Sequence, residues 1–248
     1  MKFFYICDKG IKRSNNQDFS HAEILTTPRG KVGLFVVADG MGGHNKGEVA
    51  SRLAAESFAD SFHRSLEEEK YAEEYSFRRM MRRAFDAANE RVYSLSKSEE
   101  TYRGMGTTMV AALSDENKLI VANVGDSRLY FLRDGAIRQI TVDNSYVQEL
   151  VEEGILKPEQ AKTHPDRSRI TRAVGTEKIL KIDFYETDLQ MGDKVLLCSD
   201  GLSDMLDEKE IEKLLEEHEE PKDCCEKLVE EANRKGGRDN ITVICLTI

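Results

Sequence analysis

The sequence of 248 residues lacks the features that would place it in several classes of protein. It has no apolar run near the roughly 18 residues of a membrane span and no signal-peptide pattern after Met1. Its five cysteines are an odd number without C-x-x-C spacing, which indicates reduced thiols and disfavours a structural zinc site. We therefore expect a soluble, cytoplasmic protein with no membrane partner.

The chain also lacks an excess of basic residues and any internal boundary. Lys plus Arg number 36 and Asp plus Glu number 46, a formal net charge of −10 that disfavours general binding to nucleic acid. A protein or a small molecule is the more natural partner. No repeat, low-complexity segment or Pro-rich linker divides the chain, so we expect one domain over residues 1–248.

Apolar periodicity predicts both strands and helices. Strands are expected at residues 2–7, 32–38, 181–187, 193–199 and 241–248, and throughout 107–141, which includes a hairpin of 129–132 and 136–140. Helices are expected at 45–66, 77–92, 146–152, 158–161, 207–217 and 221–234. Strand runs that alternate with helix pairs, without regular βαβ spacing, favour a layered α+β fold. The polar, irregular stretch of about 143–175 is a candidate flap over a site.

Four aspartates stand where short apolar runs begin or end: Asp39, Asp126, Asp200 and Asp239. Such runs usually become buried strands, so their ends lie at the rim of a core where a carboxylate is only partly solvated. Carboxylates gathered there would repel one another unless a cation joined them. A hard divalent metal with oxygen ligands is the natural cation, so the pattern predicts a metal site.

The chain has three Asp-Gly pairs, of which one is an ordinary turn and two are candidate metal-binding positions. Asp134 and its glycine link two expected strands at hairpin spacing, which accounts for them fully. Asp39 and Asp200, each followed by glycine, run into expected helices instead. Because glycine lets the backbone approach a ligand closely, the Gly40 carbonyl is a candidate metal ligand beside the Asp39 carboxylate.

Other local patterns point to other chemistry. Cys7, Arg13 and Ser14 fit the C-x5-R-[ST] pattern of phosphatases with a thiolate nucleophile, although the residues that follow do not resemble the helix start that this mechanism needs. The glycines after Asp39 could cradle a phosphate, but no G-K-[ST] follows them. His44 beside this turn is a candidate general acid.

Seven segments in one order along the chain carry a family resemblance. They are residues 13–18 (RSNNQD), 38–44 (ADGMGGH), 104–108 (GMGTT), 124–128 (VGDSR), 164–165 with 170–173, 198–204 (CSDGLSD) and 238–243 (RDNITV). Together they make the chain resemble the metal-dependent Ser/Thr protein phosphatases of the PPM (PP2C) family, in particular its compact bacterial form. The resemblance implies a four-layer αββα sandwich, with two central antiparallel β-sheets flanked by helix pairs.

The resemblance also implies a dinuclear Mn²⁺ or Mg²⁺ site at one end of the sandwich. By position in the motifs, Asp39 would bridge the two ions and the Gly40 carbonyl would bind one of them. Asp200 and Asp239 would complete the other. Asp126, together with Asp200, would hold a third ion, as in bacterial members of the family.

The remaining motif residues would serve the substrate and the ligands. Asp18 would support the ligands, and Arg13 would hold the substrate phosphate. The implied reaction is hydrolysis of phosphoserine and phosphothreonine by a metal-activated water, on phosphorylated proteins and in opposition to a bacterial Ser/Thr kinase. Two alternatives to this function are a phosphatase with a thiolate nucleophile and a catalytically silent binding module with the same fold. We expect the protein to be a monomer.

Two residues depart from the family pattern. Gln17 stands where many members carry Glu, which replaces a carboxylate near the metals by a neutral amide. Asn144, after Asp143 at the start of the candidate flap, replaces a frequent histidine. Neither position is one of the expected metal ligands.

Overall fold

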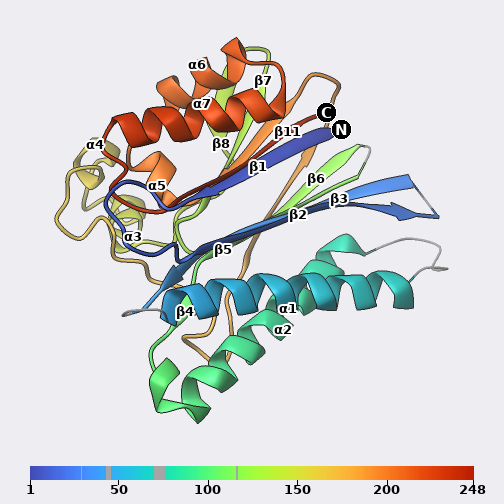
Figure 1. Ribbon diagram of the computed structural model, residues 1–248, viewed down its shortest axis with the longest axis vertical. Helices are drawn as coiled ribbons and strands as arrows, with labels where there is room; N and C mark the ends of the chain where they lie inside the picture. The colour runs from blue at the N-terminus through green and yellow to red at the C-terminus, as the bar shows by residue number, and fades with distance from the viewer. Residues whose placement is uncertain (29, 43–45, 70–75, 116) are drawn as a thin grey trace.

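Two antiparallel β-sheets pack face to face in the computed structural model, with helices on both outer faces (Figure 1). The structure describes residues 1–28, 30–42, 46–69, 76–115 and 117–248. This arrangement confirms the predicted α+β class with two central antiparallel sheets. The elements predicted from periodicity agree with those observed to within a few residues at their ends, except that the helix predicted at 77–92 continues to Ser98. Asn45, the expected start of the first long helix, lies outside the described residues.

The first sheet has five strands and contains both ends of the chain. Its order is β1 (Lys2–Asp8), β11 (Ile241–Thr247), β10 (Lys194–Cys198), β7 (Arg128–Arg133) and β8 (Ala136–Gln139). Every neighbouring pair is antiparallel. Because β1 and β11 are adjacent, the two termini lie side by side (Figure 1).

The second sheet has six strands. Its order is β2 (Asp18–Thr27), β3 (Gly30–Met41), β5 (Met109–Ser114), β6 (Lys118–Val124) and β9 (Asp183–Asp188), and the short β4 (Gly106–Thr107) pairs with the end of β3. The sequence did not predict β2. This edge strand is mostly half-buried and carries polar residues such as His21 and Glu23, so it lacks the apolar run by which β3 is recognised.

Two pairs of helices cover the sheets. The pair α1 (Lys46–Glu68) and α2 (Phe77–Ser98) covers the second sheet, and α6 (Glu208–Glu217) and α7 (Pro221–Arg234) cover the first (Figure 1). Met80, Met81, Phe85 and Val92 in the predicted stripe of α2 are all buried. Within the described part of the chain, no helix combines the length and apolar character that crossing a bilayer requires.

Alternation along the strands divides the apolar side chains into three cores. Along β3, Leu34, Val36 and Ala38 pack toward the helices, whereas Phe35 and Val37 pack toward the other sheet. Successive residues of a strand point to opposite faces, so a fully apolar run fits a strand buried on both sides. A third core lies between the first sheet and the pair α6 and α7. These three cores separate four layers.

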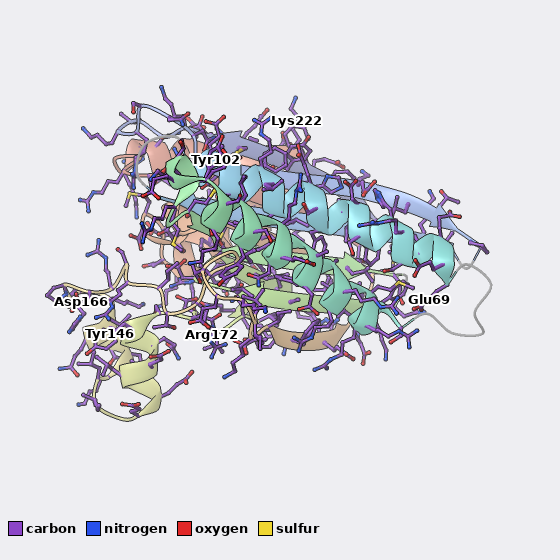
Figure 2. All side chains as sticks on the ribbon, turned by 90° about the horizontal axis from the view of Figure 1, so that it is seen from below. Glu69, Tyr102, Tyr146, Asp166, Arg172 and Lys222 are labelled. Atoms are coloured by element: carbon purple, nitrogen blue, oxygen red, sulfur yellow. The ribbon has the colours of Figure 1, made fainter. Side chains whose placement is uncertain are left out.

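Four short helices complete the fold of the described residues. They are η1 (Glu100–Tyr102), α3 (Tyr146–Glu152), α4 (Pro158–Ala161) and α5 (Asp200–Ser203). The candidate flap, about residues 143–175, contains α3 and α4 beside one end of the sandwich, and its last residues contact α2 through the hydrogen bond from the Gly175 N–H to Asn89 Oδ1. Figure 2 shows Tyr146 and Asp166 in this projecting part.

We expect the core between the sheets to be a main source of stability. Leu197 on β10 is fully buried there, so Leu197→Ala should lower the free energy of unfolding by about 2–5 kcal/mol. Urea denaturation followed by circular dichroism measures the change. Ile179→Ala is the control, because this side chain is 85% exposed and its loss should cost less than about 0.5 kcal/mol. Equal midpoints for the two variants would contradict the packing of Leu197.

Candidate metal centre

The ends of β2 and β3 place two aspartates side by side. Asp18, the first residue of β2, is paired in register with Asp39, which follows the apolar run of β3. The backbone of Asp39 is held from the other side, because its N–H donates to Thr108 Oγ1 at 3.1 Å and its carbonyl accepts from Thr107 Oγ1 at 2.8 Å. The backbone from which the Asp39 side chain extends is therefore fixed by hydrogen bonds to two adjacent threonines.

The first sheet contributes two further aspartates from adjacent strands. Asp200 is the first residue of α5, directly after β10, and Asp239 stands just before β11. Ser199 joins this end of the first sheet to the second sheet. Its hydroxyl donates to Asp18 Oδ2 at 2.7 Å and accepts from the Thr242 N–H at 3.0 Å.

Two glycines allow the backbone segments around the site to approach closely. A Cβ atom on Gly40 would lie 2.0 Å from the carbonyl oxygen of Gly47 in α1. A Cβ atom on Gly201 would lie 1.9 Å from the carbonyl oxygen of Asn240. Any side chain at either position would push these segments apart. Glycine after Asp39 and after Asp200 thus has a steric reason that differs from the ordinary turn at Asp134.

The ends of these strands and the segments that follow them surround a cavity of about 300 Å³. Its lining contains six of the residues expected from the sequence: Arg13, Asp39, Gly40, Asp126, Asp200 and Asp239. Asp18 is buried beside it and is hydrogen-bonded to Ser199. His44 lies outside the described residues. The cavity therefore gathers the expected ligands, whose roles stay predictions.

Burial and mutual repulsion make the carboxylates of this cavity hard to ionise. Burial, with smaller contributions from neighbouring carboxylates, raises the pKa of Asp18 to about 7 and that of Asp200 to about 6. The same causes raise the pKa of Asp39 and of Asp126 well above the usual range of a carboxyl. A cation bound among these carboxylates would offset both the burial of their charge and their mutual repulsion.

The donor set fits a hard divalent ion. Oδ1 of Asp18 and Oδ1 of Asp200 are both buried without a hydrogen-bond partner within the described structure. Buried carboxylate oxygens and a backbone carbonyl are ligands that Mn²⁺ and Mg²⁺ accept. Among the described residues, no three acidic, histidine or cysteine side chains converge closely enough to hold an ion alone. The Gly40 carbonyl, water and small side-chain rotations would have to complete the coordination.

Arg13 lines the cavity and is its one basic side chain among the described lining residues. Its Nη2 lies 2.5 Å from Asp239 Oδ2, and both side chains are partly exposed. A guanidinium can bind two phosphate oxygens at once, so this position suits recognition of a phosphate next to the carboxylates. In this structure the guanidinium contacts a carboxylate that is itself an expected metal ligand.

Asn240 organises the loop before β2, a role that the sequence did not indicate. Its Nδ2 donates to the carbonyls of Lys9 and Asn15 at 2.8 and 2.9 Å, and its Oδ1 accepts the Gln17 N–H at 2.8 Å. These bonds connect the segment that carries Arg13 to the segment that carries Asp239. The only signal for this role was the position of Asn240 directly after a candidate ligand.

Asn144, a departure from the family pattern, supports the turn that carries Asp126. Its Oδ1 accepts the Gly125 N–H at 3.0 Å, and its Nδ2 donates to Asp183 Oδ2 at 2.9 Å. The Gly125 φ of 107° is one that side chains rarely adopt, so the turn needs this glycine. The asparagine therefore has a structural function at the turn that carries Asp126.

Cys7 does not have the surroundings of a nucleophilic thiolate. Its sulfur accepts hydrogen bonds from Thr242 Oγ1 at 3.1 Å and Asn16 Nδ2 at 3.3 Å, and burial raises the pKa of the thiol. It lies in β1, which no helix follows directly. A thiolate mechanism needs a lowered thiol pKa at a helix N-terminus, so the geometry argues against the C-x5-R-[ST] reading.

Comparison with known proteins points to one family. The family model described as Protein phosphatase 2C matches residues 11–232. The Serine/threonine phosphatase stp of Listeria innocua is 35% identical over 237 residues, which cover 96% of this chain and 92% of that protein. The Protein phosphatase PhpP of Streptococcus pneumoniae is 34% identical over 252 residues, which cover 100% of this chain and 98% of that protein.

Solved structures are similar over the whole chain. The serine/threonine phosphatase PstP/Ppp of Mycobacterium tuberculosis has a TM-score of 0.85 and 36% identity, and the alignment covers 100% of this chain and 98% of that one. The catalytic domain of PstP in complex with two manganese ions has a TM-score of 0.80 and 35% identity, with 98% and 96% covered. The resemblance seen in the motifs thus extends to the three-dimensional structure.

The raised carboxyl pKa values predict a pH-dependent stability in the metal-free protein. A carboxyl whose folded pKa lies above its unfolded pKa stabilises the fold at low pH, and this contribution is lost as the pH rises through the folded value. For Asp18 the window runs from about pH 4 to pH 7. Asp18→Asn should therefore gain stability relative to the parent on going from pH 5 to pH 8, by on the order of 3 kcal/mol.

Urea unfolding in the presence of EDTA at both pH values measures this gain. Asp134→Asn is the matched control, because Asp134 is an exposed hairpin residue away from the cavity. It should leave the free energy of unfolding close to that of the parent. If the free energy of unfolding of Asp18→Asn differs from that of the parent by the same amount at pH 5 and pH 8, burial does not raise the pKa of Asp18.

Proposed function

The chain belongs to the protein phosphatase 2C family, and on this premise we propose how its cavity acts. The protein is a metal-dependent phosphatase that hydrolyses phosphoserine and phosphothreonine in proteins. The observation that carries the proposal is the cavity itself, whose lining combines Asp39, Asp126, Asp200 and Asp239 with Arg13, the partner of Asp239 in an ion pair. Clustered carboxylates suit divalent cations, and the arginine suits the phosphate of the substrate.

We propose two Mn²⁺ ions as the cofactor, with Mg²⁺ as the alternative. Asp39 would lie between them, the Gly40 carbonyl would bind one, and Asp200 and Asp239 would bind the other. The PstP catalytic domain with two manganese ions supports this assignment by its similarity. When bound, such ions lower the pKa of a water molecule and neutralise charge on phosphoryl oxygens.

The protein's own residues would hold this arrangement in place. Asp18 accepts the Ser199 hydroxyl, so it keeps the ends of the two sheets together below the ligands. Asp39 is positioned through its backbone by Thr107 and Thr108. A reaction that depends on the alignment of phosphorus and water benefits from ligands whose positions are set by such bonds.

Arg13 would bind the substrate phosphate. Asp239 competes with the phosphate for its guanidinium, because the two side chains form an ion pair at 2.5 Å. A cation bound by Asp239 would weaken that pair and make the guanidinium available. Binding of metal and of phosphate would therefore favour each other at this site.

Several finer assignments are part of the same proposal. Asp126 and Asp200 would hold a third ion, and residues of about 143–175 would act as a flap of a single domain. His44 is proposed as the general acid on the grounds of its sequence motif. We also propose a monomer in the cytoplasm, which the free cysteines support.

The proposed biological role is to oppose a bacterial Ser/Thr kinase. The relatives are named serine/threonine phosphatases, which supports phosphorylated proteins as the substrate class. Comparing phosphoproteomes with and without this protein would identify the sites. Phosphoserine and phosphothreonine sites should accumulate in its absence, and unchanged occupancy across them would contradict the role.

Removal of the metal or of its bridging ligand should abolish the reaction. Asp39→Asn, or EDTA in excess of metal, should slow hydrolysis of p-nitrophenyl phosphate and of a phosphothreonine peptide by at least about 100-fold, because several kcal/mol of charge stabilisation is lost. Asp134→Asn should retain activity. Cys7→Ser should also retain it, since this thiol has no part in the proposed chemistry. Hydrolysis that survives both EDTA and Asp39→Asn would refute a metal-dependent reaction.

Loss of Arg13 should separate phosphate binding from metal binding. Arg13→Ala should raise KM for p-nitrophenyl phosphate by about 10- to 100-fold, since a charge-assisted hydrogen bond is worth about 1.5–3 kcal/mol. Calorimetric titration with Mn²⁺ alone should show tighter binding than in the parent, because Asp239 loses its competing cation. Lys12→Ala, at the exposed neighbouring position, is the control for charge. Weaker Mn²⁺ binding by Arg13→Ala would contradict the competition.

A further inference from the structure

The two ends of the candidate flap are bonded to each other where they leave the sandwich. The Tyr146 N–H donates to the Arg169 carbonyl, and the Thr171 N–H donates to the Asn144 carbonyl, both at 2.8 Å. The residues between these bonds form a closed loop. This loop projects from the body of the protein, as the position of Tyr146 shows in Figure 2. The flap is therefore connected to the sandwich through the few residues at its two ends.

The first end of the flap also holds the turn that carries Asp126. The Asn144 N–H donates to the Gly125 carbonyl at 2.8 Å, and Asn144 Oδ1 accepts the Gly125 N–H at 3.0 Å. On the other side of Asp126, the Ser127 hydroxyl lies 2.8 Å from Thr108 Oγ1. The turn is therefore held by the flap on one side and by the segment between β4 and β5 on the other.

Arg128, two residues after Asp126, connects this turn to the flap by an ion pair. Its Nε lies 3.0 and 3.1 Å from the two carboxylate oxygens of Asp143, and its Nη2 lies 2.7 Å from Asp143 Oδ2. Its Nη1 donates to the Tyr130 hydroxyl at 2.9 Å, and Gln139 Nε2 donates to Asp143 Oδ1 at 2.9 Å. A planar guanidinium fixes the orientation of a carboxylate in a way that a lysine ammonium cannot. Because Asp143 directly precedes the asparagine that holds the turn, the ion pair fixes that asparagine as well.

The ion pair lines a second cavity, of about 550 Å³, between the flap and the helices α5 and α6. Asp126 and Asp200 line both this cavity and the cavity of the expected metal ligands, so the two are neighbours. The side chains of Arg128 and Asp143 are only 27% and 15% exposed. Their opposite charges offset each other, so the pair adds no net charge beside the expected cation site. Since a buried ion pair adds little stability compared with apolar residues of the same size, stability alone does not account for it.

We propose that Arg128 is a positioning residue of the phosphatase. Through Asp143 it holds the turn of Asp126 and both ends of the flap as one unit, so that the turn and the flap keep fixed positions relative to each other. This role rests on the proposed function, since Asp126 serves catalysis as an expected ligand of the third ion. Arg128 itself contacts neither the substrate nor an ion. Loosening the unit should therefore slow the reaction while phosphate binding by Arg13 stays intact.

A second ion pair on the same strand provides the matched control. Arg133, at the other end of β7, donates to Asp193 from Nε at 2.8 Å and from Nη2 at 2.6 Å. The Asp193 side chain is 2% exposed, so this pair is also partly buried. Neither residue lines either cavity. Substitutions in this pair should therefore disturb the fold as substitutions in the first pair do, but leave the reaction unchanged.

Steady-state kinetics of the full-length protein with p-nitrophenyl phosphate and Mn²⁺ test this role. Arg128→Lys and Asp143→Asn should each lower kcat by about 10- to 100-fold, the usual effect of losing a residue that orients metal ligands. KM should change by less than about threefold, because the loss of positioning for the transition state appears in kcat. The double variant should be no slower than the slower single variant, since both substitutions break the same pair.

Arg133→Lys and Asp193→Asn should keep the kcat of the parent. Equal losses of kcat in all four single variants would overturn the proposal, and so would the parent's kcat in both Arg128→Lys and Asp143→Asn. Urea denaturation of each variant verifies that it is folded. Asp143→Asn, which preserves the shape of the side chain, provides the same test if Arg128→Lys fails to fold.

Hydrogen exchange of the metal-free protein measures the connection to the flap without substrate. The amides of Tyr146 and Thr171, which are bonded across the ends of the flap, should exchange at least about 10-fold faster in Arg128→Lys than in the parent. In Arg133→Lys they should exchange at the parent's rate. Unchanged exchange in Arg128→Lys would overturn the proposal even if the protein is a phosphatase. Faster exchange in a protein without phosphatase activity would refute the proposed function alone and support the connection between Arg128 and the flap.

Discussion

The hydrogen bonds of Ser199 are the contact on which the arrangement of the site depends. This hydroxyl donates to the buried Asp18 of the second sheet and accepts from Thr242 of the first sheet. The carboxylates near it repel one another when they are ionised, and this repulsion, together with burial, raises their pKa values. The bond between the two sheet ends opposes this repulsion locally, because like charges disfavour a compact arrangement in a medium of low dielectric.

Close backbone contacts and further hydrogen bonds add to the Ser199 bonds and define the shape of the cavity. Glycine at 40 lets the end of β3 touch α1, and glycine at 201 lets α5 touch the segment before β11. Asn240 binds the loop that carries Arg13, so the phosphate-binding cation and the ligand Asp239 belong to one connected unit. The ligand positions therefore depend on the packing of both sheets, and a change in either sheet would be felt at the site.

Much of the fold and of the site could be predicted from the sequence because the signals are local. The strand β3 is a continuous apolar run, α2 has an apolar stripe, and candidate ligands stand where such runs end. The edge strand β2 was missed because its polar residues interrupt the apolar run by which a buried strand is recognised. The roles of Ser199 and Asn240 were missed because their partners lie 181 and more than 220 positions away, and no local pattern records such a bond. The ion pair between Arg13 and Asp239 joins residues 226 positions apart and was equally invisible.

Strand β11 ties the metal centre to the core of the first sheet. Asp239 and Asn240 stand just before the strand, and the Thr242 N–H within it donates to Ser199. The strand is paired with β1 on one side and with β10 on the other, and Val243 and Cys245 belong to the core beneath α6 and α7. Because backbone bonds on both edges and packing on one face fix the strand, the segment that supplies Asp239 is anchored to the centre of the sheet. The position of this metal ligand therefore depends on the packing of α7 against the first sheet as well as on the groups that line the cavity.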